Sequence, residues 1–116
     1  QPGQGSGYYA PVAVIDDASC PGNYILGQVQ NTDGAPVAGV HLIFIDQWGN
    51  RGEAVSKNSG ADYGNYDFPI GVDTAREIRA MVVDEAGNPL SPTVIVEHRQ
   101  GADADAPCHH VIWRQN

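Results

Sequence analysis

Short apolar runs separated by clusters of glycine, proline, asparagine and aspartate make up the pattern of this chain. The most apolar run covers residues 40–46, where only His41 interrupts it, and it follows an alternating run at 24–30 across the turn sequence DGAP at 33–36. This pattern predicts a strand, a tight reversal and a buried partner strand over residues 27–46. A strand that is apolar on both faces is expected to be central and covered on both sides.

The same reasoning predicts further short strands, and we expect no helix. Alternation directs Ile78, Ala80 and Val82 inward in one run, and places Val111 and Trp113 on one face of another. The expected strands lie at residues 8–15, 24–30, 40–46, 53–57, 66–70, 77–83, within 84–97, and at 108–115. Seven or eight short strands with turns at near-regular spacing predict an all-β domain, a single Greek-key β-sandwich of the transthyretin-like or Ig-like kind.

One turn and strand occurs twice along the chain. Residues 84–97 reproduce the pattern of residues 31–44 with a constant offset, so that Gly34 and Pro36 correspond to Gly87 and Pro89, and Leu42 corresponds to Ile95. Two such units are too few for a repeat array. We interpret them as two strand-turn-strand corners of one sandwich.

The N-terminal segment differs from the rest of the chain in having no charge before Asp16. Residues 1–7 read as a flexible arm, and residues 8–15 as a strand that Pro11 restricts to an edge. Two interpretations remain open: the first strand of the chain's own sandwich, or a strand donated to a neighbouring copy. We therefore divide the chain into an arm and donor strand at 1–15 and a sandwich domain at 16–116. The expected assembly residues are Tyr8, Tyr9, Val12, Val14 and Ile15.

Composition narrows the classes of function. The chain has 116 residues, enough for one domain with a core of its own. Fourteen acidic against six basic residues give a net charge of −8, which argues against nucleic acid as a partner. No apolar segment approaches the roughly 20 residues of a membrane span. A chain beginning at Gln1 is what cleavage of a secretion signal would leave, so we expect a secreted protein.

The two cysteines, Cys20 and Cys108, sit near opposite ends of the domain. In an exported chain such a pair predicts a disulfide, which would contribute about 4 kcal/mol in the chain-entropy model. The alternative is a metal site in which Cys20 joins the run Cys108-His109-His110, because thiolate and imidazole bind zinc and copper. The disulfide is the simpler use of two cysteines, and we expect it.

The run from Gly27 to Val40, with its D-G-x-P turn, is followed downstream by the G-N-Y-D-F segment at 64–68. Together they resemble the carboxypeptidase regulatory-like domains with a transthyretin-like β-sandwich, over roughly residues 25–98. The resemblance implies a secreted accessory, adhesive or structural module. It carries structural motifs and no site.

Two related patterns imply more definite chemistry. The collagen-adhesin B-type modules, which this pattern also resembles, cross-link a lysine to an asparagine, but the single lysine, Lys57, falls in a short exposed strand. Intradiol dioxygenases share the D-x-x-G-x-P-V-x-G-V segment and bind iron through two tyrosines and a His-x-His pair. His109 and His110 are adjacent and should point to opposite faces of a strand, so we expect no such iron site.

Other candidate sites carry weaker signals. Trp48, Tyr63 and Tyr66 come from neighbouring turns and could form an aromatic platform for a sugar or a protein. Oxygen-rich turns offer weak calcium candidates, although their spacing does not match an EF-hand and acidic turn residues explain them as well. These candidates are Asp62, Asn65, Asp67, Asp103 and Asp105. No serine lies in a nucleophile elbow, and no cofactor is expected.

The sequence therefore predicts a protein that is not an enzyme. Our first hypothesis is a secreted structural subunit that assembles with copies of itself into an extracellular filament or surface layer by strand donation. The alternative is an extracellular accessory module that binds carbohydrate or another surface protein.

Overall fold

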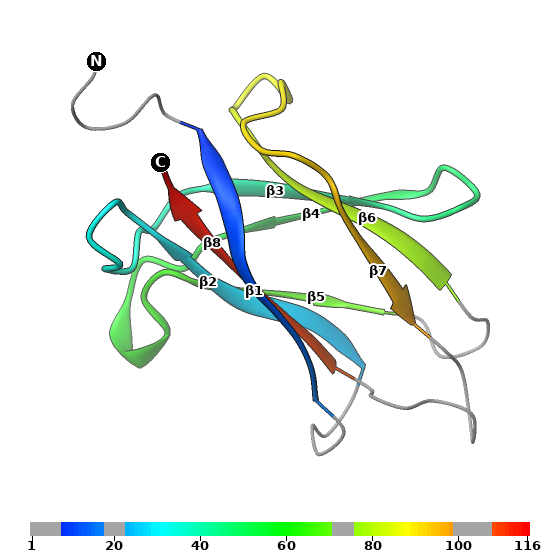
Figure 1. Cartoon of the computed structure of the whole chain (residues 1–116), viewed down its shortest axis with the longest axis horizontal. Helices are drawn as coiled ribbons and strands as arrows, with labels where there is room; N and C mark the ends of the chain where they lie inside the picture. The colour runs from blue at the N-terminus through cyan, green and yellow to red at the C-terminus, as the bar shows by residue number, and fades with distance from the viewer. Residues whose placement is uncertain (1–7, 18–22, 71–75, 99–107) are drawn as a thin grey trace.

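The structure, a computed structural model, describes residues 8–17, 23–70, 76–98 and 108–116. They form eight strands in two four-stranded sheets that pack as a sandwich, which confirms the expected all-β sandwich (Figure 1). The described residues contain no α-helix, only a 3-10 turn at Gly60–Asp62, and no helix that is long and apolar enough to cross a membrane.

The first sheet has the strand order β1-β8-β2-β5. Its strands are β1 (Tyr9–Asp17), β2 (Tyr24–Gln30), β5 (Asn65–Pro69) and β8 (Cys108–Gln115). Pairing is antiparallel between β1 and β8 and between β2 and β5, and parallel between β2 and β8. The last strand of the chain therefore lies between its first two strands.

The second sheet has the order β4-β3-β6-β7 and is antiparallel throughout. Its strands are β3 (His41–Ile45), β4 (Arg51–Val55), β6 (Arg76–Val83) and β7 (Val94–His98). The strands predicted from alternation are all present, with bounds that shift by one or two residues at most ends.

The core lies between the two sheets, where the alternating positions meet. Ile78, Ala80 and Val82 of β6 and Val111 and Trp113 of β8 are buried as alternation predicts. The rings of Phe44 and Phe68 stack across the sheets with their centroids 4.4 Å apart.

A polar contact sits in the middle of this core. The hydroxyl of Tyr66, which is 2% exposed, donates to the carbonyl oxygen of Val111 at 2.6 Å and accepts the Nε1–H of Trp113 at 3.2 Å. A Cβ added to Gly27 of β2 would lie 2.0 Å from the same carbonyl oxygen. Gly27 is therefore required so that the carbonyl of Val111 can reach the hydroxyl of Tyr66.

The stretch 27–46 is arranged differently from our prediction. β2 and β3 are not partners in one sheet: the chain crosses from the first sheet to the second between them. β3 is central, as expected, with β4 and β6 on either side. Leu42 and Phe44 enter the core, and Ile43 is 5% exposed on the opposite face.

The repeated turn is real, but the two strands that follow it differ. The side chain of Asn31 in the first copy and that of Asp84 in the second each accept two backbone N–H groups, and in both copies a glycine adopts a positive φ. The second copy connects β6 to β7 within one sheet, whereas the first crosses between sheets. Leu42 is consequently buried and Ile95 is half exposed, so their expected equivalence is wrong.

Candidate functional site

Strand β1 forms one edge of the first sheet. It pairs with the chain's own β8 from Tyr9 opposite Gln115 to Asp17 opposite Cys108, with an irregularity between Pro11 and Ala13. In the single chain, the first of our two interpretations of this segment therefore holds. The other long side of β1 has no partner strand among the described residues.

Three aliphatic side chains of β1 are half exposed: Val12 at 47%, Val14 at 52% and Ile15 at 53%. Val14 lies directly opposite Val111, so the two side chains share the inner face of the sheet. Val111 is fully buried while Val14 is not. The second sheet thus covers β8 and leaves β1 partly uncovered.

The two ends of β1 are attached by different groups. At its start, Tyr9 belongs to the core, and its backbone N–H donates to the carbonyl of Leu90 at 2.7 Å. The backbone N–H of Asn116 donates to the carbonyl of Tyr8 at 2.9 Å. At its other end, side chains add to the backbone ladder with β8.

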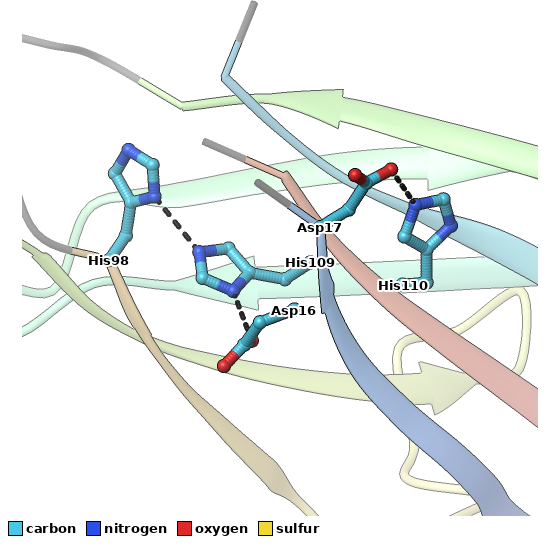
Figure 2. A network of polar contacts seen from close by, with 5 residues as sticks. All are labelled: Asp16, Asp17, His98, His109 and His110. Carbon is cyan, nitrogen blue, oxygen red and sulfur yellow. Dashed lines mark hydrogen bonds and ion pairs between the residues drawn. The ribbon is translucent and has the colours of Figure 1, made fainter. Parts of the chain in front are cut away.

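These side chains form a row of polar contacts that crosses the sandwich, shown in Figure 2. His109 of β8 is in the middle, with Nδ1 2.8 Å from Oδ1 of Asp16 on β1 and Nε2 2.9 Å from Nδ1 of His98 on β7. His98 and His109 are 2% and 4% exposed, whereas the side chain of Asp16 is 70% exposed. The row therefore links the edge strand to both sheets and runs from solvent into the core.

Chemistry determines where the protons of this row lie. An ionised carboxylate only accepts, so Nδ1 of His109 carries the proton that is donated to Asp16. In the neutral form, Nε2 of His109 is then an acceptor, and Nδ1 of His98 donates to it. The Asp-His-His order resembles the acid and base of a catalytic triad, but both rings are buried and the third group is an imidazole in place of a nucleophile.

His110 lies on the other face of β8, where its Nε2 is 3.0 Å from Oδ2 of Asp17. The expectation that adjacent histidines point to opposite faces is confirmed, and among the described residues Cys108, His109 and His110 form no metal site. Cys108 is fully buried, and no described cysteine is free. Cys20 lies outside the described residues, so its pairing with Cys108 stays a prediction.

The aromatic platform predicted from Trp48, Tyr63 and Tyr66 is wrong. Tyr66 is a core residue, so it is not available to a ligand at the surface. Trp48 is exposed in the β3–β4 turn, and Tyr63 is exposed beyond the other end of β4. The length of a strand separates the two exposed rings.

The weak calcium candidates that lie in the described residues do not come together as a calcium site. Asp67 accepts from Nζ of Lys57 at 3.0 Å in an exposed pair, and this hydrogen bond raises the pKa of the lysine. Asn65 accepts from Gln28 at 3.4 Å. Across the described ranges no three His, Cys, Asp or Glu side chains could hold a metal ion. Asp103 and Asp105 lie outside those ranges.

Two hollows mark the surface of the described sandwich. A pocket of about 310 Å³ lies where β4 meets β5, above the stacked rings of Phe44 and Phe68. A shallow groove of about 390 Å³ lies on the outer face of the first sheet, between the Lys57–Asp67 pair and His110. Neither contains an exposed aromatic platform.

Sequence reasoning did not single out His98, Asp16 or Asp17. A usable signal was present, because two aspartates end the first strand and two histidines begin the last. Antiparallel pairing of these strands places the aspartates and histidines side by side. The contribution of His98 depends on how the second sheet lies over the first, which the pattern does not encode.

Comparisons with known proteins give little to set beside this geometry. No family model matches the sequence, and no curated protein is similar to it. Among solved structures, the chain is similar to the dioxygenase domain of a dioxygenase carbohydrate-binding protein fusion from the cellulolytic bacterium Streptomyces sp. SirexAA-E. The two are 16% identical, with 84% of this chain and 80% of that chain covered and a TM-score of 0.38. A likeness at this level supports no inference about function.

Proposed function

We propose that this chain is a secreted structural subunit, not an enzyme, that assembles with copies of itself by exchanging strand β1. Each copy's β1 would complete the β8 edge of its neighbour. The observation that carries the proposal is the set of half-exposed aliphatic side chains on both faces of an edge strand, Val12, Val14 and Ile15. Exposed apolar edges of this kind are sites of association between chains.

Strand exchange fits the details of β1 better than edge-to-edge association, in which the free side of β1 would pair with an edge strand of another copy. Pro11 has no N–H group, and the ladder is irregular between Pro11 and Ala13. Both features weaken pairing along the free side of the strand. An exchanged β1 repeats in the neighbour the ladder that it already makes with β8, so neither feature opposes it.

The balance between exchanged and unexchanged forms then depends on what exchange newly covers. The ladder, the burial of Tyr9 and the contact of Asp16 with His109 are the same in both forms. The exposed halves of the three aliphatic side chains are covered in the exchanged form only where the two sandwiches pack against each other at the joint. Covering them would contribute about 3 kcal/mol per copy, at roughly 1.5–3 kcal/mol for each fully buried side chain. This is enough to shift the balance toward assembly without new polar contacts.

Several polar side chains support a structural role. The hydroxyl of Ser56 donates to the carbonyl of Val37 and accepts the N–H of Val40, and the hydroxyl of Ser91 accepts the N–H of Val82. Both serines hold backbone where the chain turns. The imidazoles of His98 and His109 are too buried to reach a substrate.

The test measures molar mass by light scattering as protein concentration rises to about 1 mM. Two copies that each gain about 3 kcal/mol gain about 6 kcal/mol together, which corresponds to a dissociation constant below this concentration. We expect the wild type to associate and the triple variant Val12→Thr, Val14→Thr, Ile15→Thr to do so at least tenfold more weakly. Ile95→Thr, at a half-exposed position on β7, is the matched control. A monomeric wild type, or a triple variant that associates like the wild type, would contradict the proposal.

Deleting residues 1–15 would not serve as this test. Tyr9 is part of the core, and β8 would lose the antiparallel strand that pairs with it. Loss of assembly in such a deletion would therefore not be distinguishable from loss of the fold.

A further inference from the structure

We propose that Asp16, His109 and His98 form a proton-sensitive latch, which holds the carboxyl end of β1 on its own sandwich and opens in mildly acidic solution. The proposal deepens the function above by naming its regulation, because the strand that the latch releases is the strand that would be exchanged. The latch itself is a property of the single chain.

Among the described residues, the latch is one of two side-chain attachments of this end of β1, beside the Asp17–His110 pair, and it reaches the opposite sheet. His109 touches Asp16 on the edge strand and His98 on the opposite sheet, at 2.8 and 2.9 Å. The neighbouring side chains of β1, Val14 and Ile15, are half exposed and contribute little burial. Opening the latch therefore leaves this end of the strand to its backbone ladder with β8 and the Asp17–His110 contact. Fraying of that ladder loses little apolar contact, while Tyr9 continues to hold the other end.

Counting protons shows why acid opens it. In the neutral row every facing pair has one donor and one acceptor. A first added proton can be accommodated, because His109 as an imidazolium donates from both nitrogens and His98 accepts at Nδ1. A second added proton places two N–H groups and two positive charges face to face across 2.9 Å, and that state has no hydrogen bond and is repelled.

The open state has no such restriction. Once the rings separate, each takes up its own proton, as an exposed histidine does near pH 6.5. The open state therefore binds more protons than the latched one, and a fall in pH favours it. The latch is therefore closed at neutral and alkaline pH and opens in acid.

Charged groups on the surrounding strands do not remove this restriction. On β6, Arg76 pairs with His98 in the backbone ladder and Glu77 pairs with Glu97 of β7. On the opposite face of β8 and β1, His110 is paired with Asp17. Within the described ranges, Asp16 is the one carboxylate in contact with the row, and it meets His109 on the side away from His98.

The His110–Asp17 pair supplies a matched control. It joins the same two strands, one residue further along each, by the same kind of contact at 3.0 Å. It differs from the latch in having no second imidazole. Faster hydrogen exchange of the β1 amides in acid should therefore persist in His110→Gln, which leaves the His98–His109 pair intact. It should disappear in His98→Gln, because the glutamine amide can donate to His109 or accept from it, as the protonation of His109 requires.

The experiment measures hydrogen exchange of backbone amides by mass spectrometry at pH 5 and pH 8, at a concentration where the chain is monomeric and with correction for intrinsic exchange. We expect protection of residues 14–17 relative to residues 42–44 of β3 to fall at least tenfold at pH 5 in the wild type and in His110→Gln. In His98→Gln the ratio should stay constant. A wild-type ratio that does not change with pH, or a change that His110→Gln abolishes, would overturn the latch.

A second readout covers the case in which His98→Gln fails to fold. A pH titration of the wild type, followed by the NMR signals of the His98 and His109 rings, should show the pair taking up one proton while β1 stays protected. The pair should take up the second proton only as the protection of β1 is lost. Uptake of both protons with β1 still protected would overturn the proposal. Because these measurements use the monomer, a latch that fails leaves self-assembly to its own test, and a monomeric wild type leaves the latch standing.

Discussion

Tyr66→Phe is the substitution that tests the core of this fold most sharply, because it removes one oxygen atom and no apolar volume. The hydroxyl satisfies two buried groups, the carbonyl of Val111 at 2.6 Å and the indole N–H of Trp113 at 3.2 Å. Each group would be left without this partner in a core that excludes water. Leaving a buried donor or acceptor unsatisfied costs about 1–3 kcal/mol, so we expect a loss of roughly 2–4 kcal/mol in the free energy of unfolding.

Urea denaturation followed by circular dichroism measures this loss, with thermal unfolding as a second assay. For a domain of this size about 1 kcal/mol lowers Tm by roughly 4 °C, so Tm should fall by about 8–16 °C. The control is Tyr63→Phe, which removes the same atom from an exposed side chain and should cost less than about 0.5 kcal/mol. Equal stability of the two variants would refute our account of the core.

Two further outcomes are expected from the same region. Gly27→Ala places a Cβ 2.0 Å from the carbonyl oxygen of Val111, and a backbone group cannot move aside cheaply. Urea denaturation should therefore show a loss above about 3 kcal/mol in the free energy of unfolding, and a loss under about 1 kcal/mol would contradict this. Burial raises the pKa of Tyr66, so the folded chain holds its phenol proton more tightly than the unfolded chain does. Stability should therefore fall as pH rises above about 10, the ordinary value for tyrosine, and the phenolate absorbance of Tyr66 should appear only as the circular dichroism signal is lost; an earlier appearance would argue that Tyr66 is accessible.

Periodicity was a reliable guide to the strands, because a half-buried strand leaves a local record in every second residue. Ile78, Ala80 and Val82 are buried because they alternate. Which strands pair is decided by contacts between distant residues and leaves no such record. The stretch 27–46 reads as a hairpin in sequence, yet β2 and β3 lie in different sheets. The repeated turn likewise predicts two corners, although Ile95 faces solvent where Leu42 faces the core.

The candidate site, too, could be predicted only in part from the sequence. The edge strand with its apolar side chains could be recognised from composition and from Pro11. The side-chain row at its end could not, because it depends on β1, β8 and β7 meeting at one point. Aromatic residues from turns were misleading for the reverse reason: Trp48 and Tyr63 are close in sequence, but the strand between them separates them.

Covalent trapping of β1 tests self-assembly by strand exchange most directly. Ala13 of β1 lies opposite Ile112 of β8 on the outer face of the first sheet, so Ala13→Cys with Ile112→Cys places two thiols within reach of a disulfide. Glu77→Cys with Glu97→Cys, opposite each other on β6 and β7, is the control that should always close within one chain. At concentrations where the wild type associates, strand exchange predicts covalent dimers and longer species on a non-reducing gel for the first pair only. Cross-links confined to single chains in both variants would contradict it.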